Sequence, residues 1–349
     1  MAKIFVTGGA GFIGSALCGF LLEAGHEVTA YDNLLLGRRD FLAPYKTNPR
    51  FSFVEEIRLR REMAGHRLVF HLAANSDIGR GARETGLDLR IGTLATHRVL
   101  EAMRLNGAGE IVFASSSAVY GDRPRVVPTP EGYGPLFPIS LYGASKLACE
   151  GLLSAFCHLF GMRAWIFRFA NIIGINGTHG AAFDFTMRLK KDPSRLTVLG
   201  DGRQAKPYLH VSDCVAGMWF GYTHAREEIN CFNLAVDGAT TVREIAETVL
   251  REAGLEGTPI EYTGGERGGY PVRGQGMVWV CSPGTTQLGY QRENGVSIIV
   301  DKDSFKAGET AAVMLTSPES GRWTLFGIEA DDLIDLQVVR IEGNAKLLQ

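Results

Sequence analysis

The sequence predicts an α/β fold: a Rossmann-type doubly wound parallel sheet, then a smaller α+β substrate region and a β-rich C-terminal segment. Over residues 1–175, short apolar runs rich in β-branched and aromatic residues alternate with helical patterns. Such runs joined by helices form a parallel sheet covered on both faces. Residues 176–271 show a mixed pattern, and the apolar runs after about residue 296 are separated by Gly, Asp, Pro and Ser, which predicts strands and turns.

The composition excludes several classes of protein. The chain has 349 residues, of which 45% are hydrophobic and 21% charged, and its formal net charge is −2. This charge gives no field for binding nucleic acid or anionic lipid. No apolar run approaches the ~18 residues of a membrane span, and no signal peptide is visible. We expect a cytoplasmic protein whose cysteines are free thiols, without a metal site.

The elements of the first 175 residues follow in order. Six strands are expected, at residues 3–8, 27–32, 51–56, 67–73, 110–116 and 163–171. Three helices are expected between them, at residues 12–25, 94–107 and 146–161, with apolar residues at spacings of three and four. Residues 56–67 leave room only for an abbreviated helix. Further on, Thr241 and Glu244 form a predicted capping box at the start of a helix that ends at Gly254.

The turn after the first strand, "TGGAGFIGS", carries Gly8, Gly11 and Gly14 in a G-x-x-G-x-x-G spacing. Glycines let the backbone turn tightly and approach a pyrophosphate, whose charge meets the N-terminal N–H groups of the helix. The strand–turn–helix context favours dinucleotide binding, and the alternative is a turn that only packs the helix on the strand.

Asp32 ends the second predicted strand, where a carboxylate can accept a hydrogen bond from a ribose 2′-hydroxyl. Because it would repel a 2′-phosphate, Asp32 favours NAD over NADP. Arg38 and Arg39 follow closely and weaken this preference slightly.

Two further segments carry polar groups. In "LYGASK", Tyr142 and Lys146 are four residues apart and share one face of a helix, either as a proton-transfer pair or as an aromatic residue and a solvated amine. In "ASSSAVYG", serine hydroxyls end the fifth strand, where parallel sheets bind ligands. Alternatively, these hydroxyls satisfy their own backbone.

Together with "YDN", "VFHLAA" and "RFANIIG", these motifs occur in an order that resembles the extended short-chain dehydrogenases/reductases of the nucleotide-sugar epimerase/dehydratase family. The resemblance covers residues 3–271, continues in "VLGDGRQAKPYLHVSDC", and is greatest to the UDP-glucose 4-epimerase branch. Dehydratase relatives carry an Asp-Glu pair where Ser117 and Ala118 stand here. Because loss of water needs such an acid/base pair, a dehydratase is disfavoured.

The resemblance implies catalytic roles for three residues. Tyr142 would be the general base and acid on the sugar 4-hydroxyl, with its phenolate favoured by the Lys146 ammonium and by a positive nicotinamide ring. Lys146 would also hold the nicotinamide ribose. Ser116 matches the catalytic hydroxyl, with Ser117 as the alternative. The implied reaction is C4 epimerisation of a UDP-linked hexose through a 4-keto sugar, with NAD regenerated in each turnover.

The resemblance also implies binding residues. Those expected at NAD are Gly8, Gly11, Phe12, Ile13, Gly14, Asp32, Asn33, Glu56, Ile57, Leu72, Ala73, Ala74, Tyr142 and Lys146. Those expected at the substrate are Ser116, Ser117, Asn171, Lys206 and Arg267. For Lys206 and Arg267, a solvated surface charge is an equal alternative.

Two segments depart from the family pattern. Gly92 stands where relatives have an asparagine in the fourth helix, which predicts a kinked helix or a missing water contact. Residues 296–349 instead resemble part of a macroglobulin-type β-domain of the α2-macroglobulin family, which suggests a fused C-terminus. The expected domains are an NAD-binding domain over residues 1–175, a sugar-nucleotide region over 176–271, a junction over 272–295 and the tail.

Alternative functions stay open from the sequence. One is another nucleotide-sugar reaction of the same fold, a reduction or a decarboxylation. Another is a catalytically impaired NAD-binding protein, because the closing C-terminal segment is replaced. Family likeness also implies a homodimer.

Overall fold

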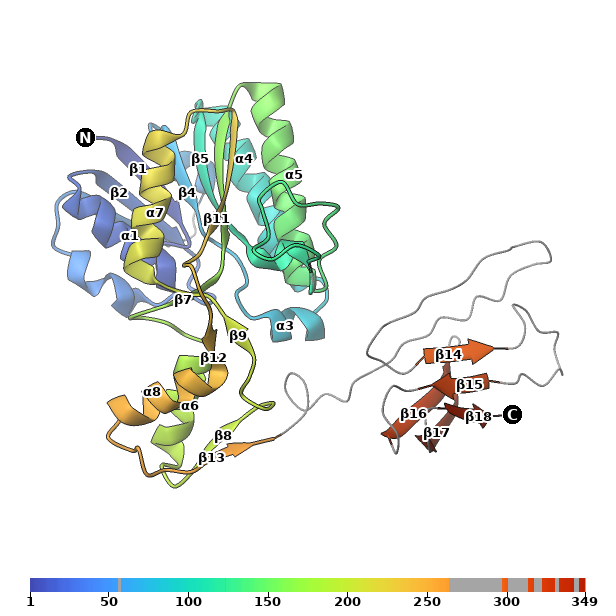
Figure 1. Cartoon of the computed structure of the whole chain (residues 1–349). Coiled ribbons are helices and arrows are strands. Elements are labelled where there is room, and N and C mark those ends of the chain that lie inside the picture. Colours follow the sequence, from blue (N-terminus) through green and yellow to red (C-terminus); the bar gives the residue numbers. More distant parts are fainter. Residues whose placement is uncertain are drawn as a thin grey trace, which may run out of the picture. The chain divides into compact units, whose positions relative to one another are not determined.

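A seven-stranded parallel sheet with the order β11-β6-β5-β4-β1-β2-β3 organises the first part of this computed structural model (Figure 1). Its strands are β1 Lys3–Thr7, β2 Glu27–Asp32, β3 Phe51–Glu55, β4 Leu68–His71, β5 Glu110–Ser116, β6 Arg163–Phe169 and β11 Ile229–Leu234. The strand order reverses between β1 and β4, which is where open α/β sheets bind ligands. The predicted fold class is thereby confirmed.

The structure describes residues 1–55, 58–122 and 124–263, and five short strands between residues 297 and 348. The chain forms two compact units. The first comprises residues 1–198 and 202–261, and the second comprises residues 199–201 and 262–349. The sheet and the cavity discussed below both belong to the first unit.

Helices cover both faces of the sheet, as the sequence predicts. The helices α1 Phe12–Glu23 and α7 Val211–His224 lie on one face, and α4 Ala95–Asn106 and α5 Leu141–Phe160 lie on the other (Figure 1). Leu17 and Met218 are fully buried in the first layer, and Leu100 and Leu153 in the second. Full burial of such a side chain contributes about 1.5–3 kcal/mol, so these two layers fix the sheet between the helices.

Local signals set the helix ends near the cavity. Ser140 caps α5 by accepting a hydrogen bond from the Gly143 N–H at 3.0 Å, and α5 ends at Gly161, whose φ of +64° is left-handed. The short helices α2 Leu59–Glu62 and α3 Ile78–Arg83 connect the strands. The four residues of α2 match the abbreviated helix that the sequence predicts.

The chain before α4 is not a regular α-helix. Residues Leu89–Leu94 form a π-helical turn, η2, with Gly92 inside it. A π turn is a local irregularity of the kind that bends helices and is frequent at functional sites. The expectation of a disturbed helix at Gly92 is therefore met.

The smaller α+β region does not follow the predicted boundary between residues 175 and 176. Because α7 and β11 complete the large sheet and its cover, residues 211–234 belong to the Rossmann part rather than to a separate α+β region. The remaining elements are α6 Ala181–Lys191, α8 Val242–Glu252, and the paired strands β7 Asn171–Ile173 with β10 Tyr208–His210, β8 Leu196–Val198 with β13 Ile260–Tyr262, and β9 Ala205–Lys206 with β12 Thr240–Thr241. The predicted capping box of Thr241 and Glu244 is present.

The described C-terminal residues are all in strands. One sheet contains β14 Ser297–Val300, β15 Val313–Thr316 and β18 Ala345–Leu348, and a hairpin contains β16 Arg322–Glu329 and β17 Leu333–Ile341. This agrees with the predicted β-rich tail.

The cysteines and the search for membrane-spanning helices bear on two further expectations. Five cysteines fall within the described residues, and all five are free thiols. In the part of the chain that the structure describes, no helix combines the length and apolar character needed to cross a membrane.

Candidate active site

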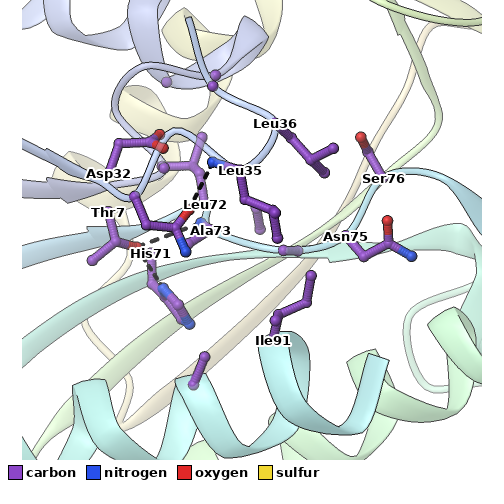
Figure 2. Close-up of a pocket in the computed structure, with 18 of the residues that line it drawn as sticks. Thr7, Asp32, Leu35, Leu36, His71, Leu72, Ala73, Asn75, Ser76 and Ile91 are labelled. Atoms are coloured by element: carbon purple, nitrogen blue, oxygen red, sulfur yellow. Dashed lines mark hydrogen bonds between the residues drawn. The ribbon is translucent and has the colours of Figure 1, made fainter. Parts of the chain in front are cut away.

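A cavity of about 520 Å³ opens at the carboxyl ends of the strands of the large sheet (Figure 2). Every described residue that the sequence predicts for the cofactor lines it: Gly8, Gly11, Phe12, Ile13, Gly14, Asp32, Asn33, Leu72, Ala73, Ala74, Tyr142 and Lys146. Glu56, Ile57 and Arg267 lie outside the described residues. Motifs that are far apart in the sequence thus line the same cavity.

The glycine-rich turn can be built only from glycines at two of its positions. Gly8 has a φ of +69°, and a Cβ atom there would lie 2.7 Å from the Ala73 backbone nitrogen. A Cβ atom on Gly14 would collide with the Gly8 carbonyl oxygen. The turn closes with a hydrogen bond of 3.0 Å from the Gly11 N–H to the same carbonyl. The backbone therefore approaches the cavity directly, as a pyrophosphate site requires.

Asp32 is held rigidly at the end of β2. One carboxylate oxygen accepts from the Ala10 N–H at 3.0 Å and the other from the Leu34 N–H at 2.8 Å. A carboxylate has about four lone-pair sites, which suits it to accept hydrogen bonds from the hydroxyls of a ribose.

The two nearby arginines do not line the cavity. Arg38 pairs with Asp40 at 2.6 Å, and Arg39 pairs with Glu55. Their charges are thus engaged by acids on the surface rather than directed at a 2′-phosphate beside Asp32. This arrangement supports the predicted preference for NAD.

Lys146 is buried beneath the cavity, with 5% of its surface exposed. Its Nζ atom donates to the Ala114 carbonyl oxygen at 2.5 Å and lies 4.7 Å from the centre of the Phe113 ring. Burial lowers the pKa of Lys146 from 10.5 to about 8, against the opposing effect of Cys149, Glu150 and Asp88.

Tyr142 lies one turn before Lys146, and the Nζ atom is 5.8 Å from the centre of its ring. Burial raises the pKa of the Tyr142 phenol, and Asp88 and Cys149 raise it further, whereas a hydrogen bond with the Ser116 side chain lowers it. The sequence expects the Lys146 ammonium and the positive nicotinamide ring together to favour the phenolate, and with NAD bound this stays a prediction. Desolvation of the phenol has a larger effect on its pKa than the hydrogen bond with Ser116. The positive nicotinamide ring would therefore have to lower the pKa of Tyr142.

The two candidate serines differ in their surroundings. Ser116 is half-buried, its Oγ atom accepts from the Ala118 N–H at 3.2 Å, and it is hydrogen-bonded to Tyr142. Ser117 is exposed. The contact with Tyr142 favours Ser116 as the hydroxyl that acts with the phenol.

None of the four described residues predicted for the substrate lines the cavity: Ser116, Ser117, Asn171 and Lys206. The Asn171 side chain donates to the Pro207 carbonyl oxygen at 3.2 Å. Lys206 lies in β9, opposite Thr240. Neither lines the cavity, so their role at a substrate stays a prediction.

A buried histidine in the cavity wall was given no role by the sequence. His71 Nδ1 is 2.6 Å from the Thr7 hydroxyl (Figure 2), and Nε2 is 2.9 Å from the Thr96 hydroxyl. Burial lowers its pKa to about 3, so the ring is neutral. It links β1, β4 and α4 beneath the cofactor loop, and the "VFHLAA" motif was the available signal.

Thr178 and His179 also line the cavity, from the connection between β7 and α6. The connection is tied to α1, because Asn176 Nδ2 is 3.5 Å from Ser15 Oγ. Nothing in the sequence pattern indicated that these two residues reach the cavity.

Comparison with known proteins adds an independent observation. The model of the NAD dependent epimerase/dehydratase family matches residues 4–235. A putative UDP-glucose 4-epimerase of Methanocaldococcus jannaschii is 30% identical over 268 residues, which are 74% of this chain and 84% of that protein. A dTDP-glucose 4,6-dehydratase of Streptomyces griseus is 30% identical over 274 residues, 76% of this chain and 83% of that protein.

A solved structure agrees with these matches. The crystal structure of a UDP-galactose 4-epimerase is similar with a TM-score of 0.67 and 39% sequence identity, and the match covers 74% of this chain and 86% of that chain. The predicted family resemblance is thereby confirmed. The macroglobulin-type resemblance of the tail finds no support in these comparisons.

Proposed function

Because this chain belongs to the NAD dependent epimerase/dehydratase family, we propose that it catalyses NAD-dependent epimerisation at C4 of a nucleotide-linked hexose of the UDP-glucose/UDP-galactose type. Its cofactor is NAD. An epimerase and a dehydratase relative have the same 30% identity to the chain, so overall similarity does not choose the reaction. The choice rests on the residues of the cavity.

The cavity fits a dinucleotide. Gly8 and Gly14 leave no room for side chains where the backbone faces the pyrophosphate position, and Asp32 accepts hydrogen bonds at the end of β2. Leu72, Ala73 and Ala74 would cover the cofactor, and Lys146 would hold the nicotinamide ribose. When bound, NAD takes a hydride from the sugar carbon and returns it.

The chain's own residues move the proton. Tyr142 takes the proton of the sugar 4-hydroxyl and later returns it, so that a 4-keto sugar exists only transiently. The Ser116 hydroxyl donates a hydrogen bond to the sugar oxygen, and the Lys146 charge favours the ionised phenol. Rotation of the keto sugar between the two hydride transfers gives the epimer.

One observation carries the proposal: the Tyr142 phenol, in contact with Ser116 and above Lys146, lines the same cavity as the glycine-rich turn. The dehydratase alternative lacks its acid pair, because Ser117 and Ala118 stand at those positions and begin the short helix η3, Ser117–Tyr120. We propose that Asn171, Lys206 and Arg267 contact the nucleotide sugar.

We also propose a homodimer formed through α4 and α5. The apolar side chains that are exposed on or beside these helices, between 41% and 68%, include Leu94, Leu105, Leu141, Leu159 and Phe160. A group of exposed apolar side chains on neighbouring helices is typical of an interface.

The test is direct. The purified chain is examined for the absorbance of retained NAD, then incubated with UDP-galactose, and the formation of UDP-glucose is followed. Conversion without added NAD supports the proposal. Retained NAD without conversion of UDP-glucose, UDP-galactose, or their N-acetyl and uronic forms contradicts it and supports the catalytically impaired alternative. Release of water or carbon dioxide supports the other chemistries of the family.

A further inference from the structure

A cluster of buried polar side chains lies behind Tyr142 and Lys146, and the proposed reaction does not use it. Asp88 is 3% exposed and Asn75 is 1% exposed. The Asn75 amide donates to the Asp88 Oδ1 atom at 3.0 Å, and the Ser145 hydroxyl donates to the Asp88 carbonyl oxygen at 2.9 Å. Thr93 joins the cluster through its hydroxyl, 3.0 Å from that of Ser145.

Two glycines give this cluster its space. A Cβ atom on Gly92 would collide with the Ser145 hydroxyl, and a Cβ atom on Gly81 would collide with the Asp88 Oδ2 atom. The absence of side chains at these positions lets Ser145 reach the π turn and lets Asp88 pack directly against α3. The first contact involves the Ser145 hydroxyl that connects the cluster, and the second involves the other carboxylate oxygen of Asp88.

Asp88 carries an unexplained feature. Its Oδ2 atom is buried and has no hydrogen-bond partner among the described residues. A buried carboxylate oxygen without a partner is costly, and a core residue of similar shape without charge would avoid that cost. A functional role would account for the presence of a carboxylate here.

The two partners of Asp88 lie in different parts of the site, beside the cofactor loop and on the helix α5, and the loop and the helix must stay in a fixed position relative to each other. Asn75 lines the cavity next to the loop that covers the cofactor (Figure 2). Ser145 lies on α5, between Tyr142 and Lys146. We propose that Asp88 is a positioning residue, which holds the cofactor loop through Asn75 and the catalytic helix through Ser145. The inference rests on the proposed function, because it takes Tyr142 and Lys146 as the reacting pair.

The charge of Asp88 has a second consequence. It raises the pKa of Tyr142 and also that of Lys146, opposing the effect of burial on the latter. The groups that face Tyr142 are Ser116 at the end of β5, Lys146 and Cys149 on α5, and Asp88 before η2. Asp88 thus adds to the larger effect of burial on the pKa of Tyr142 and opposes the effect of burial on the pKa of Lys146.

The test separates shape from charge. Asp88→Asn keeps an oxygen that accepts from Asn75 and removes the charge, whereas Asp88→Ala removes both. Ser145→Ala leaves the Asp88 side chain unchanged and removes the hydroxyl that donates to the Asp88 carbonyl oxygen and contacts the Thr93 hydroxyl. Two quantities are measured: the NAD dissociation constant, and the pKa of Tyr142 from the phenolate absorbance that is lost on Tyr142→Phe in each background. Glu247→Gln, which removes an exposed carboxylate on α8, is the matched control.

We expect Asp88→Asn to lower the pKa of Tyr142 and to leave NAD binding nearly unchanged. Asp88→Ala should weaken NAD binding about tenfold, since a hydrogen bond to a charged group is lost. If Asp88→Ala does not fold, Ser145→Ala carries the positioning test, with weaker NAD binding expected and the Tyr142 pKa less affected than in Asp88→Asn.

A wild-type pKa of Tyr142 in Asp88→Asn, together with wild-type NAD binding in Ser145→Ala and in any folded Asp88→Ala, would overturn the inference. Neither readout needs turnover. If the wild-type chain converts no UDP-sugar but the variants show these shifts, the proposed function is refuted and the role of Asp88 is not.

Discussion

The Nζ atom of Lys146 lies 5.8 Å from the centre of the Tyr142 ring, and both residues project from the first two turns of α5 into one cavity. Burial opposes charge on both side chains: it raises the pKa of the phenol and lowers that of the ammonium. The phenol is therefore protonated in its own surroundings, whereas the ammonium loses its proton near pH 8, and an additional positive charge would affect both groups. This is the setting that a reaction with a positively charged cofactor ring requires.

The glycine-rich turn should be sensitive to a single methyl group. Gly14→Ala should abolish NAD binding, because its Cβ atom would overlap the Gly8 carbonyl oxygen. Gly151→Ala is the matched control, since it lies in α5 with no atom within 4 Å of a Cβ, and it should stabilise the helix by about 0.5–1 kcal/mol. Equal NAD affinity of the two variants would contradict the assigned turn.

The reaction rate should depend on pH through Lys146. Its pKa of about 8 means that the ammonium is lost as the pH rises through that value, so kcat should fall on the alkaline side. Lys146→Arg stays charged there and should be slow but free of this decline. The measurement is a pH–rate profile of both proteins, and an identical alkaline decline would assign it to another group.

A buried ion pair should support the fold beside the site. Arg168 and Glu150 form two hydrogen bonds of 3.0 and 2.7 Å, and both side chains are less than 10% exposed. Glu150→Ala should lower the free energy of unfolding by about 3–5 kcal/mol, because it leaves a buried charge without its partner.

Urea denaturation followed by circular dichroism measures this change. Arg195→Ala is the control, because Arg195 pairs with Asp192 on the surface and should change stability by about 0–1 kcal/mol. Similar losses in the two variants would show that the Arg168–Glu150 pair has no special role.

The proposed dimer predicts a change of mass. The wild-type chain should elute as a dimer in size-exclusion chromatography with light scattering, and Leu159→Asp with Phe160→Asp should produce monomers. Phe220→Asp is the control, because Phe220 is also exposed but lies on α7 against the opposite face of the sheet. A monomeric wild type would refute the interface.

Local patterns predicted much of the fold. Alternating apolar runs and helical spacings placed six of the seven sheet strands, and the capping box of α8 formed as expected. The seventh strand, β11, was assigned to the wrong region, because its sequence, "INCFNL", does not state which sheet it joins. That choice depends on tertiary pairing with β6, far away in the chain.

The candidate site shows the same limit. Glycine spacing and the Tyr142–Lys146 spacing are local, and they placed the cavity wall correctly. The effects of burial and of the Asp88 charge, which both raise the pKa of Tyr142, were not foreseen, because both arise from packing between elements. Asp88 and His179 gave no local signal of a role, and His71 stood only within the "VFHLAA" motif, since the partners of all three lie on other strands, helices and loops.

The most direct test of the account compares the wild-type chain with Tyr142→Phe, each with NAD bound, in the conversion of UDP-galactose to UDP-glucose. Tyr45→Phe is the control, because Tyr45 packs against α1 outside the cavity. The account predicts that Tyr142→Phe retains NAD and loses about 10²–10⁴-fold in kcat, the usual contribution of a general acid–base group, while Tyr45→Phe keeps the wild-type rate. Conversion by Tyr142→Phe at the wild-type rate would contradict it.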